Sequence, residues 1–363
     1  MFYYLSDFKD LFFGLNIFKY ITFRAGMAVF TSFLLCIIFA PIFIDKFKKR
    51  QIHENVKRDD CPQLDTLHST KQGTPTMGGI FIIGSILISV LLWCDLSSRY
   101  VQLTFLTCLW LAILGFADDY VKLTRKKAKK RGLSALTKFC WQLLLGFLVG
   151  GFIFANPTTS TKLDIPFLKA MTIDLGIFYI PFALFVIIGA CNAVNLTDGL
   201  DGLAIGCVLI AALGLGALSY ISGNIKFTEY LFLPYIGGSG ELSVFCAAII
   251  GASLGFLWFN CYPASIFMGD VGSLALGGTL GVIAVFIKKE FLLVLLGGVL
   301  VVEALSVILQ VTSYKLTRKR IFKVSPLHHH LQLCGWNESK IIVRFWIIAI
   351  ILALLTLTTL KIR

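Results

Sequence analysis

The chain has 363 residues, of which 57% are hydrophobic and only 15% are charged, and its formal net charge is +13 at pH 7. This balance excludes a water-soluble globular domain and predicts an all-α, polytopic membrane protein that lies in a lipid bilayer. A positive net charge is also typical of nucleic-acid binding. In a membrane protein it indicates how the loops are oriented, so no nucleic-acid partner is expected.

Apolar stretches of about twenty residues, the length that crosses a bilayer, recur along the chain. Ten are predicted to be spans: 25–45, 77–94, 101–117, 139–155, 176–191, 203–222, 242–259, 271–287, 291–311 and 341–360. Residues 1–24 mix aromatic residues with a few charges, which favours an interfacial helix. No repeat or low-complexity linker divides the chain, so a single domain over residues 1–363 is expected.

Lys and Arg gather on one side of these spans. The loops after the first, third, fifth, seventh and ninth spans hold 22 of the 33, which predicts that these loops are cytoplasmic and that both termini lie outside the cytoplasm. All the unusual polar stretches fall at the same five loops. The sequence therefore predicts one composite site at the cytoplasmic surface of the membrane.

The first polar stretch, Lys71–Gly79, leads into the second span. Pro75 is typical of a helix start, and free amides at a helix N-terminus attract phosphate. Lys71 adds a positive charge.

The next stretch closes the third span with Asp118 and Asp119, and Lys122 follows four residues after Asp118. An ordinary surface ion pair is one explanation. The other is a cation site, because adjacent carboxylates repel each other and Mg²⁺ prefers carboxylate oxygens. The basic run from Lys122 to Lys138 indicates topology and attraction to anionic lipid, with Lys138 the expected exception.

Between the fifth and sixth spans, four polar residues recur at a spacing of three: Asn192, Asn195, Asp198 and Asp201. On a helix this spacing predicts a single polar strip. The strip either caps a helix end or binds a ligand, since polar groups next to hydrocarbon are costly.

The loop from Asn260 to Ser273 carries Asp270 between two glycines, which leaves its carboxylate uncrowded. Asp270 is a candidate metal or phosphate ligand, and N-capping of the eighth span is the alternative. Glu303 lies within the ninth span, where a buried acid has either a functional or a structural partner.

Three adjacent histidines, His328, His329 and His330, precede the last span. Adjacent imidazoles do not readily face one ion, so hydrogen bonding to phosphate or sugar is favoured over a zinc site.

Together these stretches resemble the phospho-N-acetylmuramoyl-pentapeptide transferase family, within the polyprenyl-phosphate N-acetylhexosamine-1-phosphate transferases. The resemblance extends from about residue 70 to 336 and includes the motifs Lys71–Gly79, Asp118–Lys122, Asn192–Asp201, Phe267–Ser273, Glu303–Gln310 and Pro326–His330. Two departures stand out. Gln332 occupies a position where the family usually has Glu, and Pro62 and His68 are farther apart than in the family.

The resemblance implies a Mg²⁺-dependent transfer of phospho-MurNAc-pentapeptide from UDP-MurNAc-pentapeptide to undecaprenyl phosphate, giving lipid I and UMP. It implies a multi-pass protein of the bacterial cytoplasmic membrane that forms a homodimer. It makes Asp118, Asp119 and Asp270 catalytic, with Asp270 as the metal ligand. The implied substrate-binding residues are Lys71, Lys122, Lys138, Asn192, Asn195, Asp198, Asp201, Asn260, Phe267, Gln310, His328, His329 and His330.

Two alternatives remain at this point. One is a sister transferase that uses UDP-N-acetylglucosamine. The other is an ion-coupled transporter that uses the acids of the third and ninth spans, although all of these acids except Glu303 lie at one face.

Overall fold

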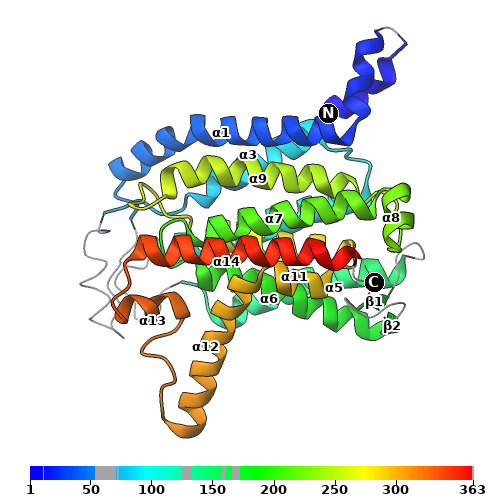
Figure 1. The fold of residues 1–363 in the computed structure, drawn as a ribbon. Helices are drawn as coiled ribbons and strands as arrows, with labels where there is room; N and C mark the ends of the chain where they lie inside the picture. The colour runs from blue at the N-terminus through cyan, green and yellow to red at the C-terminus, as the bar shows by residue number, and fades with distance from the viewer. Residues whose placement is uncertain are drawn as a thin grey trace.

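The computed structural model describes residues 1–10, 12–53, 71, 73–124, 132–156, 161–165 and 172–361, which form a bundle of long, roughly parallel helices (Figure 1). Residues 62–68, whose spacing departs from the family, and the basic run 125–131 lie outside the described residues. The helices are α1 Ile21–Lys49, α3 Gly79–Trp93, α4 Arg99–Thr124, α5 Ala135–Ala155, α6 Tyr179–Thr197, α7 Leu203–Ser222, α8 Ile225–Leu231, α9 Glu241–Asn260, α10 Gly269–Phe286, α11 Glu290–Leu296, α12 Gly298–Thr317, α13 Leu327–Leu333 and α14 Glu338–Thr358.

Short elements lie around this bundle. β1 (Lys162–Asp164) and β2 (Thr172–Asp174) form an antiparallel pair in which Leu163 lies opposite Ile173. The 3₁₀ helices are η1 Phe2–Phe8, η2 Phe13–Lys19, η4 Gly176–Phe178 and η5 Thr359–Lys361.

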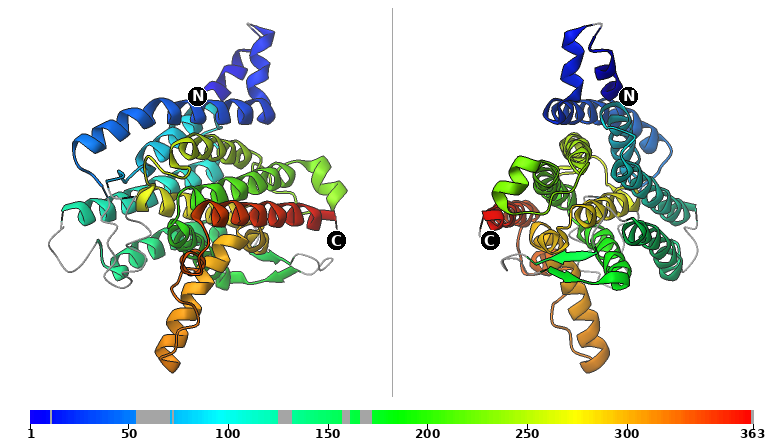
Figure 2. Two further views of the ribbon diagram at one scale, coloured as in Figure 1. Left: turned by 60° about the vertical axis from the view of Figure 1, so that its left-hand side comes forward. Right: turned by 90° about the vertical axis from the view of Figure 1, so that its right-hand side faces the viewer.

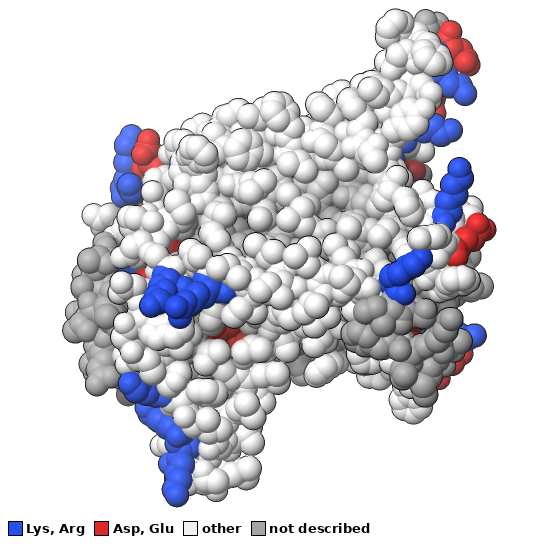
Figure 3. Space-filling view, in the orientation of Figure 1, with Lys and Arg blue, Asp and Glu red and all other residues white. Residues whose placement is uncertain are grey.

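The prediction of an all-α polytopic membrane protein is confirmed. Among the described residues, nine helices are long and apolar enough to cross a membrane, and the shorter apolar α3 corresponds to the one predicted span not among them, 77–94. A space-filling view shows a broad uncharged belt between two charged ends, as expected for a bilayer-spanning bundle (Figure 3).

The ninth predicted span, 291–311, is wrong as one continuous helix. The chain breaks at Gly297 into α11 and α12, and α12 continues to Thr317. Two adjacent glycines, Gly297 and Gly298, have low helix propensity and supply the break. After the break α12 leaves the bundle and projects from its side (Figures 1 and 2).

Residues 1–24 do not form one helix. They form η1 and η2, and α1 already begins at Ile21. The two short helices project from the bundle on the side opposite to α12 (Figure 2), and their interfacial location stays a prediction.

Helix α10 forms the centre of the bundle. All its residues from Val271 to Phe286 are buried, and α4 and α6 pack on it. Glycines allow a close backbone approach at these contacts: a Cβ on Gly115 of α4 would lie 2.3 Å from the Asp270 carbonyl oxygen. The packing of α4 against α10 therefore sets the distance between Asp118 or Asp119 and Asp270.

Both termini lie toward one end of the bundle, and α13 lies at the other (Figure 1). Which end faces the cytoplasm stays a prediction. Hydrogen bonds and ion pairs bring together four of the five polar stretches, and a Cβ on Gly199 would lie 2.3 Å from His328 Nε2, so the histidine stretch lies against them.

Candidate active site

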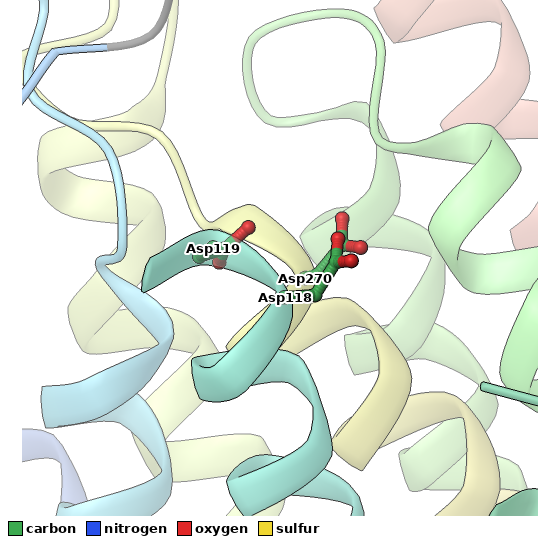
Figure 4. Close-up of side chains that lie close together, drawn as sticks. All are labelled: Asp118, Asp119 and Asp270. Carbon is green, nitrogen blue, oxygen red and sulfur yellow. The ribbon is translucent and has the colours of Figure 1, made fainter. Parts of the chain in front are cut away.

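Three carboxylates meet where α4 ends and α10 begins. Asp118, Asp119 and Asp270 each place one oxygen within 4.8 Å of the other two. Their side chains are 0%, 5% and 14% exposed, respectively. Asp118 and Asp270 lie side by side, and Asp119 lies to one side (Figure 4), where it accepts a hydrogen bond of 3.2 Å from the Val271 amide. Three buried carboxylates this close require cations around them.

Two lysines supply part of that positive charge. The Lys122 ammonium lies 2.9 Å from Asp118, 3.2 Å from Asp119 and 3.1 Å from Asp270. The Lys138 ammonium lies 2.8 Å from Asp118 and 2.9 Å from Asp270. Because Asp118 is fully buried and Lys122 reaches all three acids, the arrangement is not an ordinary surface ion pair.

Asp270 does not cap α10. The N-cap position is Met268, and the Asp270 carboxylate instead faces the lysines and accepts a hydrogen bond of 3.0 Å from the Asn195 amide. Asn195 also donates to the Ser273 hydroxyl at 2.9 Å. As a first-turn carboxylate, Asp270 gains from the positive end of the α10 dipole, while its oxygens contact Lys122 and Lys138.

The predicted helical strip from Asn192 to Asp201 is wrong beyond its first two members. Helix α6 ends at Thr197, Asp198 is its C-cap residue, and Gly202 adopts φ +79° to begin α7. Asn195 reaches the carboxylates. Asn192 is exposed and donates to the Gln142 side chain instead, at 3.1 Å.

Lys71 lies in a second charged cluster. Its ammonium is 2.7 Å from Asp201 and 2.5 Å from Glu338, the first residue of α14. The Asp201 amide also donates to Glu338 at 3.0 Å. Sequence reasoning missed Glu338, since a single Glu at the start of a predicted helix resembles ordinary first-turn charge.

Asn260 and Phe267 hold the backbone around this cluster. The Asn260 oxygen accepts from the Gly202 amide at 2.9 Å, and its nitrogen donates to the Ile266 carbonyl at 2.8 Å. Phe267 exchanges backbone hydrogen bonds of 2.8 Å with Gly78 and Pro75. The substrate contacts predicted for Asn260 and Phe267 stay predictions.

The expected phosphate site at the start of the second span is wrong. Pro75 lies in an extended segment, and α3 begins four residues later, at Gly79. The amides of Gly78 and Gly79 donate to the carbonyls of Phe267 and Met268 at 2.8 Å, so the neighbouring loop already satisfies them.

The three histidines contact different groups. His328 is fully buried, and its Nδ1 lies 3.1 Å from the Glu303 carboxylate, which also accepts from the His328 amide. The Nδ1 of His329 lies 2.9 Å from the Gln332 oxygen. Gln332 is therefore placed to accept a hydrogen bond as the usual Glu would, without the negative charge.

His330 and Gln310 contact the loop between α12 and α13. The Nδ1 of His330 accepts from the Lys323 amide at 3.2 Å. The Gln310 side chain bonds the backbone of Ile321 and Phe322. Among the described residues, the three aspartates form the one cluster with metal-ligand spacing, and it contains no histidine.

An apolar cavity of about 250 Å³ opens between α12 and the helices α6, α10 and α11. Along α6 its lining extends from Phe185 to Val194, roughly 14 Å of helix. The next residue, Asn195, donates to Asp270. The α6 part of the lining therefore stops one residue before Asn195, and on α10 the lining begins at Gly277, seven residues after Asp270.

A membrane bundle that combines an apolar cavity with a cluster of carboxylates and lysines has the arrangement of a membrane-embedded transferase acting on a lipid and an anionic group. The comparisons agree: residues 101–288 match the Glycosyl transferase family 4 profile, and residues 71–83 match the phospho-N-acetylmuramoyl-pentapeptide-transferase signature 1. The chain belongs to the phospho-N-acetylmuramoyl-pentapeptide transferase family, and it is a glycosyl-1-phosphate transferase of peptidoglycan synthesis.

Full-length relatives carry that name. The chain is 55% identical over 364 residues to the transferase of Thermodesulfovibrio yellowstonii, and the alignment covers 99% of this chain and 98% of the relative. It is 54% identical over 358 residues to that of Citrifermentans bemidjiense (99% and 97%) and 49% identical over 380 residues to that of Brachyspira hyodysenteriae (98% and 98%). Enzymes of this family use a nucleotide-sugar donor and a polyprenyl phosphate acceptor.

Proposed function

We propose that the chain transfers phospho-MurNAc-pentapeptide from UDP-MurNAc-pentapeptide to undecaprenyl phosphate at the cytoplasmic face of the bacterial inner membrane, releasing UMP. The observation that carries this proposal is the apolar cavity whose α6 lining stops one residue before Asn195, the hydrogen-bond donor to Asp270. A long polyprenyl chain needs an apolar path, and its phosphate must leave that path next to cationic groups.

In this scheme an oxygen of the lipid phosphate attacks the β-phosphorus of the donor, and the bond between that phosphorus and the bridging oxygen of UMP breaks. Phosphoryl transfer depends on alignment and charge neutralisation more than on covalent help. Lys122 and Lys138, each in contact with Asp118 and Asp270, donate hydrogen bonds to the phosphoryl oxygens.

The acidic cluster fits a divalent cation. Its ligand atoms are hard carboxylate oxygens that approach one another within 4.8 Å, the kind of ligand Mg²⁺ prefers. Asp270 would hold the ion, with Asp118 and Asp119 beside it, and the bound ion would neutralise diphosphate charge.

Asp118 orients the lysines. It accepts from Lys122 and Lys138 and from the Leu133 amide at 2.7 Å. A phosphate monoester is largely ionised at pH 7, because its second pKa is about 6, so no general base is required. Asp118→Asn in a single-turnover assay tests this role: a base or a covalent nucleophile predicts loss of transfer, whereas orientation alone leaves measurable transfer.

We assign the other predicted substrate-binding residues by their distance from the two charged clusters, the Lys71 cluster and the cluster of three aspartates. Lys71 and Asp201 bind the nucleoside end of the donor, with Asp198 and Phe267 beside them, and Asn192, Asn195, Asn260, Gln310 and the three histidines line the rest of the substrate path. Lys71→Ala and Asp198→Ala are expected to weaken UMP binding in calorimetry. Unchanged affinity in both variants contradicts this placement.

The direct test measures UMP release by detergent-purified protein from UDP-MurNAc-pentapeptide, with and without undecaprenyl phosphate, in Mg²⁺ or in EDTA. We expect release only with both lipid and Mg²⁺. Turnover of UDP-N-acetylglucosamine in its place would make the chain a sister transferase, and inactivity with both donors would refute the proposal. Cross-linking in membranes tests the proposed homodimer.

A further inference from the structure

Glu338 connects two parts of the site that are far apart in the sequence. It is the first residue of α14, and the same carboxylate oxygen, Oε1, accepts from the Lys71 ammonium at 2.5 Å and from the Asp201 amide at 3.0 Å. The side chains of Lys71, Asp201 and Glu338 are 9%, 3% and 10% exposed, respectively. The contact is therefore buried and strongly directional, unlike a solvated surface pair.

The two carboxylates fix the direction of Lys71. A lysine side chain is flexible and loses considerable rotamer freedom when it is held in one direction, and its ammonium has three N–H donors. Asp201 and Glu338 accept two of these donors. The ammonium is thus immobilised before any ligand arrives, and its third donor has a defined direction.

Glu338 also holds the turn that carries Asp201. The other Asp201 oxygen accepts from the Ala264 amide at 3.0 Å, and the next residue, Gly202, donates to Asn260 at 2.9 Å. With the Asp201 amide bound to Glu338, the turn after α6 is fastened to α14 and to the loop before α10. Glu338 therefore holds both the Lys71 ammonium and the turn that carries Asp201.

We propose that Glu338 is a positioning residue for the donor substrate. It acts through Lys71 and the Asp201 turn, so that the nucleoside end of the sugar-nucleotide substrate meets an ammonium whose N–H groups already point in a fixed direction. This role rests on the proposed function. Because Glu338 acts on binding and not on the phosphoryl group, its loss raises the KM for the donor and leaves kcat at saturating donor unchanged.

The test uses Glu338→Ala and Glu338→Gln, with Glu229→Gln as the matched control, since Glu229 is an exposed acid on α8. Loss of a charge-assisted hydrogen bond predicts that Glu338→Ala raises the donor KM and the UMP Kd about tenfold. Glu338→Gln retains an acceptor oxygen at this position and gives a smaller increase of about threefold. Glu229→Gln changes neither value.

A double-mutant cycle separates positioning from general support of the fold. In a Lys71→Met background the Glu338 substitutions should raise the UMP Kd by clearly less than in the wild type, because only the contact with the Asp201 amide is then left to lose. An equal tenfold loss in that background, or a fall in kcat with unchanged KM, overturns the role. Wild-type protein that binds no UMP refutes the proposed function as well. Wild-type binding that Glu338→Ala and Glu338→Gln leave unchanged refutes the role of Glu338 alone.

Discussion

A single added methyl group at Gly115 should separate the carboxylates of Asp118 and Asp119 from that of Asp270. A Cβ at this position would lie 2.3 Å from the Asp270 carbonyl oxygen and 2.6 Å from the Val271 Cα. Ordinary contact begins at 3.4 Å, so the backbones of α4 and α10 must move apart by about 1.1 Å. The obstacle is backbone, so no side chain can rotate away to relieve it.

That displacement acts directly on the site, because Asp118 and Asp119 follow Gly115 on α4 and Asp270 begins α10. Overpacking of this kind destabilises by about 1–3 kcal/mol. A misplacement of about 1 Å in a catalytic arrangement reduces the rate by roughly 100-fold. Gly115→Ala should therefore lose about two orders of magnitude in UMP release and show a lower unfolding temperature in detergent.

Gly84→Ala provides the matched control. It lies within α3 and a Cβ there meets nothing within 4 Å. Alanine stabilises a helix interior by up to about 1 kcal/mol relative to glycine, so this variant should be fully active and no less stable than the wild type. A Gly115→Ala variant with the wild-type rate and unfolding temperature would refute the view that this packing sets the site geometry.

Four further changes give distinct readouts. Asp270→Asn should reduce UMP release by at least about 1,000-fold, measured in the same assay, because it removes the charge that both lysines and the expected cation share. Arg24→Met should lower the unfolding temperature, because Glu241, 12% exposed, loses the two hydrogen bonds of 2.6 and 2.7 Å from Arg24 and keeps the one from the Asp95 amide. We expect a loss of about 3 kcal/mol, which the double variant Arg24→Met/Glu241→Leu partly restores. Ala304→Trp, in the cavity lining, should raise the KM for undecaprenyl phosphate without changing the UMP Kd, and an unchanged lipid KM would remove the lipid from this cavity. Calorimetry should show that EDTA weakens binding of the UDP-sugar far more than binding of uridine, and equal losses would contradict the separation of the two clusters.

Convergence of the polar stretches was predictable because a bilayer leaves few places for charge. Polar groups next to hydrocarbon are costly, so Asp118, Asn195 and Asp270 had to lie at span ends, and the Lys and Arg distribution indicated which ends lie together. The interior position of α10 follows from its many small residues, which admit neighbouring backbones closely.

The features that sequence reasoning missed depend on contacts between distant segments. Glu338 lies 267 residues from its partner Lys71, and no local periodicity links them. The amides of Gly78 and Gly79 looked available for phosphate until the fold brought the carbonyls of Phe267 and Met268 to them. The break at Gly297 was hidden for a different reason, since the apolar character of the segment continues across it.

The two charged clusters suit different ends of one donor. With every group ionised, Lys71 with Asp201 and Glu338 has a formal net charge of −1, and so do the two lysines with Asp118, Asp119 and Asp270. A negative cluster repels a diphosphate, so the second cluster requires an additional cation before it attracts one. The Lys71 cluster needs no such help, because an uncharged carbonyl or hydroxyl of a nucleoside can accept from the fixed ammonium. Dependence on a divalent cation should therefore be confined to the phosphate end of the donor, while the nucleoside end contributes affinity that the cation does not change.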